Sequence, residues 1–126
     1  MSDFKTILIA EDEGPMLRAL VDKFEKSGFK VFPAQDGEEG LSKALKEKPD
    51  ILMLDIIMPK INGLELIKKI RDDKWGEQVP IILLTNLSDN DSVAEAAKYG
   101  VYDFLVKTDW HLDDIVKLVK ERLEII

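Results

Sequence analysis

The feature that most constrains this chain is a set of four short apolar segments in which polar and apolar residues do not alternate. They are residues 7–10, 51–54, 81–84 and 104–106. Each is too short for a helix, and an unbroken apolar run of this length is typical of a parallel strand buried on both faces. A weaker segment at 31–32 lies between Lys30 and Pro33, and the nearby charge and missing amide favour an edge strand. We therefore predict five strands.

Helical periodicity fills each gap between these segments and also follows the last one. The apolar positions that carry it are Leu17, Leu20, Val21 and Phe24; Leu41, Ala44 and Leu45; Leu64, Ile67 and Ile70; Val93, Ala94, Ala96 and Ala97; and Leu112, Ile115, Val116, Val119 and Leu123. Spacings of three and four residues place each set on one helix face. Gly28 and Gly100 stand where two of these helices should end. We predict five helices that alternate with the strands.

A chain that alternates strands and helices through short connections forms a parallel sheet, because each crossover is right-handed and lays its helix on one face. The predicted fold class is α/β, with a five-stranded parallel sheet of order 2-1-3-4-5 and five helices on both faces, as in flavodoxin-like folds. The 126 residues fit one domain over 1–126, because two domains would leave each half without an adequate core.

Composition narrows the chemistry that this chain can perform. It has no cysteine and one histidine, which excludes disulfides, thiolate metal sites and multi-histidine metal sites. Its 18 basic and 25 acidic side chains give a net charge of −7, which argues against direct nucleic-acid binding. The sequence contains neither an apolar run long enough for a bilayer nor a visible secretory signal, so we expect a cytoplasmic protein that does not use the membrane.

Polar side chains follow four of the five predicted strands, at the point where each strand ends. They are Glu11 and Asp12, then Asp55, Thr85 and Lys107. In an open parallel sheet, ligands bind at the carboxyl ends of the strands, near the switch point between the first and third strands. Each of these residues taken alone is better explained as a helix cap, a strand end or a surface charge. Their joint position is what suggests a site.

Three neighbouring carboxylates require a positive partner, because crowding them without one would raise their pKa values or destabilise the fold. Oxygen ligands without histidine or cysteine favour a hard cation, and carboxylates combined with waters and a phosphate are how proteins bind Mg²⁺. A phosphoryl group is therefore the expected companion of the cation. A carboxylate in such a site can act as a nucleophile and form an aspartyl phosphate.

The polar residues belong to five separated motifs: Glu11-Asp12, Asp55-Ile56-Ile57-Met58-Pro59, Asn62-Gly63, Thr85 and Phe104-Leu105-Val106-Lys107. In this order and spacing they resemble the receiver domain of two-component response regulators, over nearly the whole chain. The resemblance implies that Asp55 is the phosphoacceptor. It implies that Mg²⁺ is held by Glu11, Asp12, Asp55 and the backbone carbonyl of Ile57, and that the phosphoryl oxygens are bound by Thr85 and Lys107.

The resemblance also implies a phosphorylation-controlled interaction module that transforms no separate substrate. A sensor histidine kinase or a phosphotransfer protein would supply the phosphoryl group, and an unknown protein target would respond to it. Phe104 would report the switch: Thr85 moves inward, and the surface made by the fourth helix, last strand and fifth helix changes. Receivers often pair through the last helix, so a weak homodimer stays among the open oligomeric states.

Several positions depart from the family pattern. Thr108 follows Lys107 where proline with a cis bond is usual, and we expect a trans bond because a cis bond before a non-proline residue costs about 2.5 to 4 kcal/mol. Asn86 is larger than the small residue usual after the threonine, and Ile57 and Leu87 are apolar where polar groups are common. We expect the differences at Asn86, Ile57 and Leu87 to slow the loss of the phosphoryl group.

Three other functions stay open at this point. A small phosphatase would also use Asp55 as nucleophile, although Ile57 stands where that chemistry usually places an acid. A flavin-binding electron carrier would share the sheet order, although the acidic residues Glu11, Asp12 and Glu13 would repel a phosphate after the first strand. An inert pseudo-receiver would keep the fold without the chemistry, and the intact set of site residues argues against it.

Overall fold

The computed structural model describes residues 4–86, 89–107 and 111–124, and in them strands and helices alternate along the chain. The elements are β1 (Thr6–Ala10), α1 (Gly14–Lys26), β2 (Lys30–Ala34), α2 (Gly37–Glu47), β3 (Ile51–Asp55), α3 (Gly63–Asp72), the short 3-10 helix η1 (Trp75–Glu77), β4 (Ile81–Thr85), α4 (Asn90–Ala97), β5 (Asp103–Val106) and α5 (Leu112–Arg122). The predicted number and order of strands and α-helices are confirmed.

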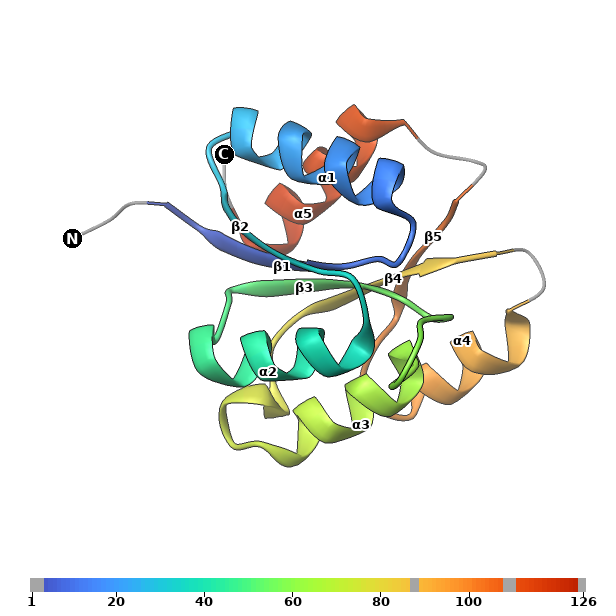
Figure 1. Cartoon of the computed structure of the whole chain (residues 1–126). Coiled ribbons are helices and arrows are strands. Elements are labelled where there is room, and N and C mark those ends of the chain that lie inside the picture. The colour runs from blue at the N-terminus through green and yellow to red at the C-terminus, as the bar shows by residue number, and fades with distance from the viewer. Residues whose placement is uncertain (1–3, 87–88, 108–110, 125–126) are drawn as a thin grey trace.

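All strands are parallel and lie in the order β2-β1-β3-β4-β5, which confirms the predicted topology. Helices α1 and α5 cover one face of the sheet, while α2, α3 and α4 cover the other (Figure 1). The weak strand β2 forms one edge, as Lys30 and Pro33 predicted, and β5 forms the other edge.

Two apolar layers explain why the strand segments show no polar alternation. Leu52 and Leu54 of β3 join the core beneath α2 and α3, whereas Met53 between them joins the core beneath α1 and α5. Because helices cover both faces, both sets of side chains are buried, and every residue of β3 and β4 is buried. Burial of the central strands therefore fixes the positions of their carboxyl ends in the sheet.

Local signals account for several helix ends. Gly28 and Gly100 have φ angles of 94° and 76°, a left-handed conformation that glycine adopts readily, just after α1 and α4. Asn62 caps α3, because its side chain accepts a hydrogen bond from Glu65 N at 2.9 Å. Leu45, predicted on the apolar face of α2, is instead 38% exposed. Ala44 is buried in the core and Leu41 packs against it, so these two residues form the apolar contact of the helix.

Some sequence expectations concern residues outside the described part of the chain. Leu87 and Thr108 are among these residues, and so is the Lys107–Thr108 bond. Helix α5 begins at Leu112 with His111 at its N-cap position. Among the described helices, none combines the length and the apolar character that crossing a membrane requires.

Candidate functional site

Parallel register brings the acidic ends of β1 and β3 side by side. Ala10 is paired with Leu54, so Glu11 and Asp55 follow from neighbouring positions. The backbone N–H of Glu11 also donates to Ala34 O at 3.0 Å, which keeps the chain in line with β2 beyond the end of β1. Carboxylate oxygens of Glu11, Asp12 and Asp55 all lie within 4.8 Å of one another. The predicted acidic cluster therefore forms.

Lys107 supplies a positive charge inside this cluster. Its Nζ lies 2.9 Å from Asp55 Oδ2 and donates a hydrogen bond there, and it lies 3.0 Å from Glu11 Oε2. The lysine is placed by its backbone, because Lys107 N donates to Thr85 O at 2.8 Å just past the paired ends of β4 and β5. The positive partner that the crowded carboxylates require is thus, in part, a residue of the chain itself.

Burial controls the electrostatics of the site. Asp55 is 3% exposed and Glu11 is 0% exposed. Burial raises the pKa of Asp55 to about 7, with the negative charge of Glu11 adding to the rise and Lys107 opposing it. Burial also acts to lower the pKa of Lys107, but hydrogen bonds to Asp55 and Glu11 outweigh that effect and raise it. The lysine therefore stays charged while Asp55 titrates near neutrality.

The donor set fits a hard cation. Glu11 Oε2 is buried without a hydrogen-bond partner among the described residues, although the charge of Lys107 is near, so this oxygen keeps a lone pair available. Asp12 is exposed and adds a solvent-facing carboxylate beside two buried ones. An all-oxygen set with an open, water-facing side matches the way proteins bind Mg²⁺.

The loop from β3 to α3 carries Ile57, the residue whose carbonyl the family resemblance assigns to the metal. Ile56 and Met58 are buried on either side of it, whereas the Ile57 side chain is 59% exposed. The loop is therefore anchored in the core at alternate residues, and Ile57 lies at the surface between two anchors.

Thr85 and Phe104 lie on the β4–β5 side of the site. Thr85 is buried, and its hydroxyl donates to Leu105 O at 3.4 Å, so in this structure the hydroxyl bonds to β5. Phe104 is 50% exposed on β5. Thus Glu11, Asp12, Asp55 and Lys107 form one cluster, while the Thr85 hydroxyl is engaged with the neighbouring strand.

Two contributors were absent from the sequence-based set. Glu13 Oε1 lies 3.7 Å from Lys107 Nζ, and Glu13 N donates to Glu11 Oε1 at 3.1 Å. Gly63 packs directly beneath Asp55, because a Cβ there would lie 2.3 Å from Asp55 O. The acidic run after β1 and the Asn62-Gly63 pair were visible signals for these residues.

Comparisons with known proteins agree with this arrangement. A family model described as the response regulator receiver domain matches residues 7–120. The chain is 35% identical over 123 residues to the alkaline phosphatase synthesis transcriptional regulatory protein PhoP of Bacillus subtilis, a match that covers 96% of this chain and 50% of that protein. It is 39% identical over 101 residues to the response regulator ArlR of Staphylococcus aureus, covering 80% of this chain and 45% of that one.

Among solved structures, the chemotaxis response regulator CheY4 of Vibrio cholerae superposes with a TM-score of 0.86. The two chains are 25% identical, and the match covers 94% of this chain and 98% of CheY4. The chain thus spans about half the length of the curated relatives but nearly all of this structural neighbour.

Proposed function

Because this chain belongs to the family of response regulator receiver domains, we propose that it is a signalling switch operated by phosphorylation of Asp55. The observation that carries the proposal is the buried Asp55 carboxylate held between the Lys107 ammonium and the carboxylates of Glu11 and Asp12. Such a carboxylate is close to a cation and shielded from bulk water, and the exposed carboxylate of Asp12 lies beside it. These are the properties that an acyl-phosphate acceptor needs.

In the proposed reaction an oxygen of the ionised Asp55 attacks the phosphorus of a phosphohistidine. The new O–P bond forms as the P–N bond breaks, and the imidazole leaves with the electron pair. Lys107 stands 2.9 Å from Asp55 Oδ2 and balances negative charge on the transferred group. The donor of the phosphoryl group is a sensor histidine kinase or a phosphotransfer protein.

Mg²⁺ is the proposed cofactor, held by Glu11, Asp12, Asp55 and the backbone carbonyl of Ile57. When bound, the ion neutralises charge on the transferring phosphoryl group. Glu11 Oε2, which lies near Lys107 but accepts no hydrogen bond within the described part of the chain, and the all-oxygen donor set support this assignment. Lys107 then has fewer carboxylates to neutralise and is available for the phosphoryl oxygens.

The proposed output is a change of the surface formed by α4, β5 and α5. Thr85 leaves its hydrogen bond with Leu105 O, a long one at 3.4 Å, and binds a phosphoryl oxygen. Phe104, half exposed on β5, then becomes buried and reports the switch. An unknown protein target would read this surface. The net charge of −7 argues against nucleic acid as its direct partner.

The test is intact mass after incubation with Mg²⁺ and acetyl phosphate, for the wild type and for Asp55→Asn. We expect one phosphoryl adduct that requires both Mg²⁺ and Asp55, and that decays slowly because apolar Ile57 lies where family members often carry a polar group. A folded protein that forms no adduct would indicate a pseudo-receiver. Steady turnover of a generic phosphate ester would indicate a phosphatase, and a yellow protein would point to a flavin carrier.

A further inference from the structure

We propose that Gly37, at the start of α2, is a positioning residue for the metal site, because it sets the place of the β3–α3 loop. The inference rests on the proposed function, since it concerns the Mg²⁺ ligand expected from that loop. Gly37 is the first residue of α2, just after the turn that follows the edge strand β2, and neither its sequence position nor its chemistry marks it as part of the acidic cluster.

The turn and the loop are in backbone contact. A Cβ on Gly37 would lie 1.7 Å from Ile61 O and 2.5 Å from Ile61 C, distances at which backbone must move. Gly37 N donates to Pro59 O at 3.3 Å, so the same residue also bonds to the loop. The absence of a side chain at position 37 therefore sets how closely the β3–α3 loop can approach α2.

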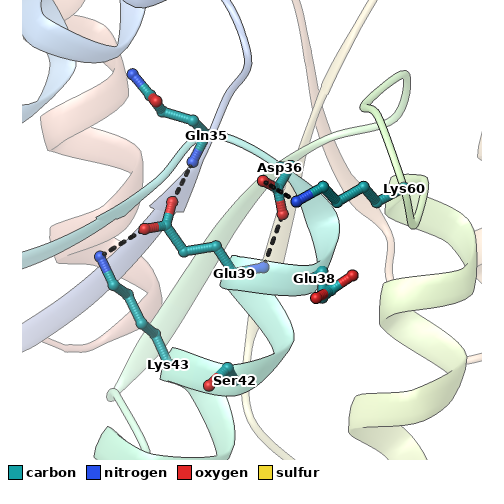
Figure 2. A pocket seen from close by; sticks show the side chains of 7 residues that line it. All are labelled: Gln35, Asp36, Glu38, Glu39, Ser42, Lys43 and Lys60. Atoms are coloured by element: carbon teal, nitrogen blue, oxygen red, sulfur yellow. Dashed lines mark hydrogen bonds and ion pairs between the residues drawn. The ribbon is translucent and has the colours of Figure 1, made fainter.

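The loop is shaped to meet this turn. Lys60 has a φ of 69°, which is unusual for a residue with a side chain, and Ile61 N donates to Pro59 O at 2.9 Å. Lys60 Nζ reaches across to Asp36 Oδ2 at 3.6 Å (Figure 2). Asp36 is held in turn as the N-cap of α2, where it accepts from Glu39 N at 2.8 Å (Figure 2).

A displacement at Ile61 reaches Ile57 because the segment between them is short and anchored. Gly63, two residues beyond Ile61, donates from its N–H to Ile56 O at 2.7 Å and packs against Asp55 O. The loop is thus a closed turn between Asp55 and Gly63, and Gly37 contacts it at Pro59 and Ile61. Mg²⁺ demands near-ideal octahedral geometry, so a shift of this backbone weakens a site that uses the Ile57 carbonyl.

The experiment compares Gly37→Ala with two matched glycine variants by titrating each folded protein with Mg²⁺ and following the amide shifts of Glu11, Asp12 and Glu13. Gly76→Ala creates a similar collision, 1.9 Å from Ile70 O, but in η1, where the chain leads into the start of β4. Gly40→Ala lies on α2 itself, where the nearest atom is Leu66 Cδ2 at 3.3 Å. Thermal unfolding of all variants is measured alongside.

We expect Gly37→Ala to weaken Mg²⁺ binding by about tenfold or more, as the loss of an outer-shell support does in other metal sites. Gly76→Ala should lose stability but bind Mg²⁺ like the wild type, and Gly40→Ala should bind normally. Equal Mg²⁺ affinity in Gly37→Ala and the wild type, or an equal loss in Gly76→Ala, would overturn the inference. A wild type that binds no Mg²⁺ would instead overturn the proposed function.

Ile61→Ala keeps the inference testable if Gly37→Ala does not fold. Ile61 packs against the core beneath α2 and α3, so its truncation removes packing that holds the same loop in place and adds no collision. We expect weaker Mg²⁺ binding near the lower end of the same range, about tenfold. Unchanged Mg²⁺ affinity in folded Ile61→Ala would contradict the positioning role.

Discussion

The two halves of the site are packed in opposite ways. At the ends of β1 and β3, Glu11 and Asp55 are buried. The segment that follows Asp55 lies so close to Gly37 and Gly63 that neither position has room for a side chain. On the other side β4 is also buried, but Phe104 of β5 is half exposed and no residue of β5 is buried. The part of the site around β1 and β3 is therefore close-packed, while β5, which is expected to change in the switch, is loosely covered.

Helix α4 extends this contrast. Its N-cap residue Asp89 forms no side-chain cap with the helix, and within the helix Ala96 alone is buried. Few buried contacts make a segment cheap to displace, which is what a switch surface requires. The tightly packed residues of the proposed metal site and the sparsely buried residues of the proposed switch surface thus lie on different strands of one sheet.

The largest expected effect tests whether Arg71 holds the segment that follows α4 in place. Arg71 on α3 donates to the carbonyls of Tyr99, Gly76 and Val79 at 2.7 to 2.8 Å, and so ties the segment after α4 to the segments around η1. Because three carbonyls lose a charged donor, Arg71→Ala should lower the unfolding free energy by about 3 kcal/mol. Urea denaturation measures it. Lys69→Ala, an exposed control on the same helix, should stay within about 0.5 kcal/mol.

The next effect tests the cost of burying the negative charge of Asp55 in the close-packed part of the site. The pKa of Asp55 is raised to about 7, so the folded state binds its proton more tightly than the unfolded state, and the contribution of Asp55 to stability falls as the pH rises towards 7. Asp55→Asn removes that charge and should raise metal-free stability by about 2 kcal/mol near pH 8 and little near pH 4. Urea denaturation at both pH values checks this. A stabilisation equal at both would contradict the assigned cause.

Mg²⁺ affinity should depend on the same titration of Asp55, but it should rise with pH where the Asp55 contribution to stability falls. The proposed Mg²⁺ site uses ionised Asp55, whose pKa is about 7, so below that pH the proton would compete with the ion. We expect the apparent Mg²⁺ affinity to fall up to about tenfold for each pH unit below 7 and to level off above it. Amide-shift titrations at several pH values measure this. A pH-independent affinity would show that the ion does not contact Asp55.

The smallest effect concerns the exposed half. Phe104→Ala removes a side chain that is already half exposed, so the loss of stability should be about 1 kcal/mol. Phosphorylation by acetyl phosphate should still occur, while the accompanying amide shifts of α4 become smaller. Tyr102→Ala, at a residue that is 74% exposed next to β5, is the matched control and should leave those shifts unchanged.

Much of this architecture could be predicted before any coordinates. Apolar runs without polar alternation, such as 51–54, predicted that helices cover both faces of the sheet. The order of elements then predicted that Glu11, Asp55 and Lys107 lie at one edge of it. These conclusions depend on local periodicity and on chain topology, which a sequence carries directly. The expected need for a positive charge also followed from the residues alone.

The way those residues meet depends on long-range contacts in the folded chain. Lys107 pairs with Asp55 and Glu11 across 52 and 96 residues of chain, and Thr85 bonds to β5. The roles of Gly37 and Gly63 likewise depend on which backbone lies opposite them. The fold and the chemistry of the strand ends could be predicted from the sequence, because periodicity is local and the order of elements limits the topology. Distances, burial and the raised pKa of Asp55 depend on long-range packing, which no local pattern specifies.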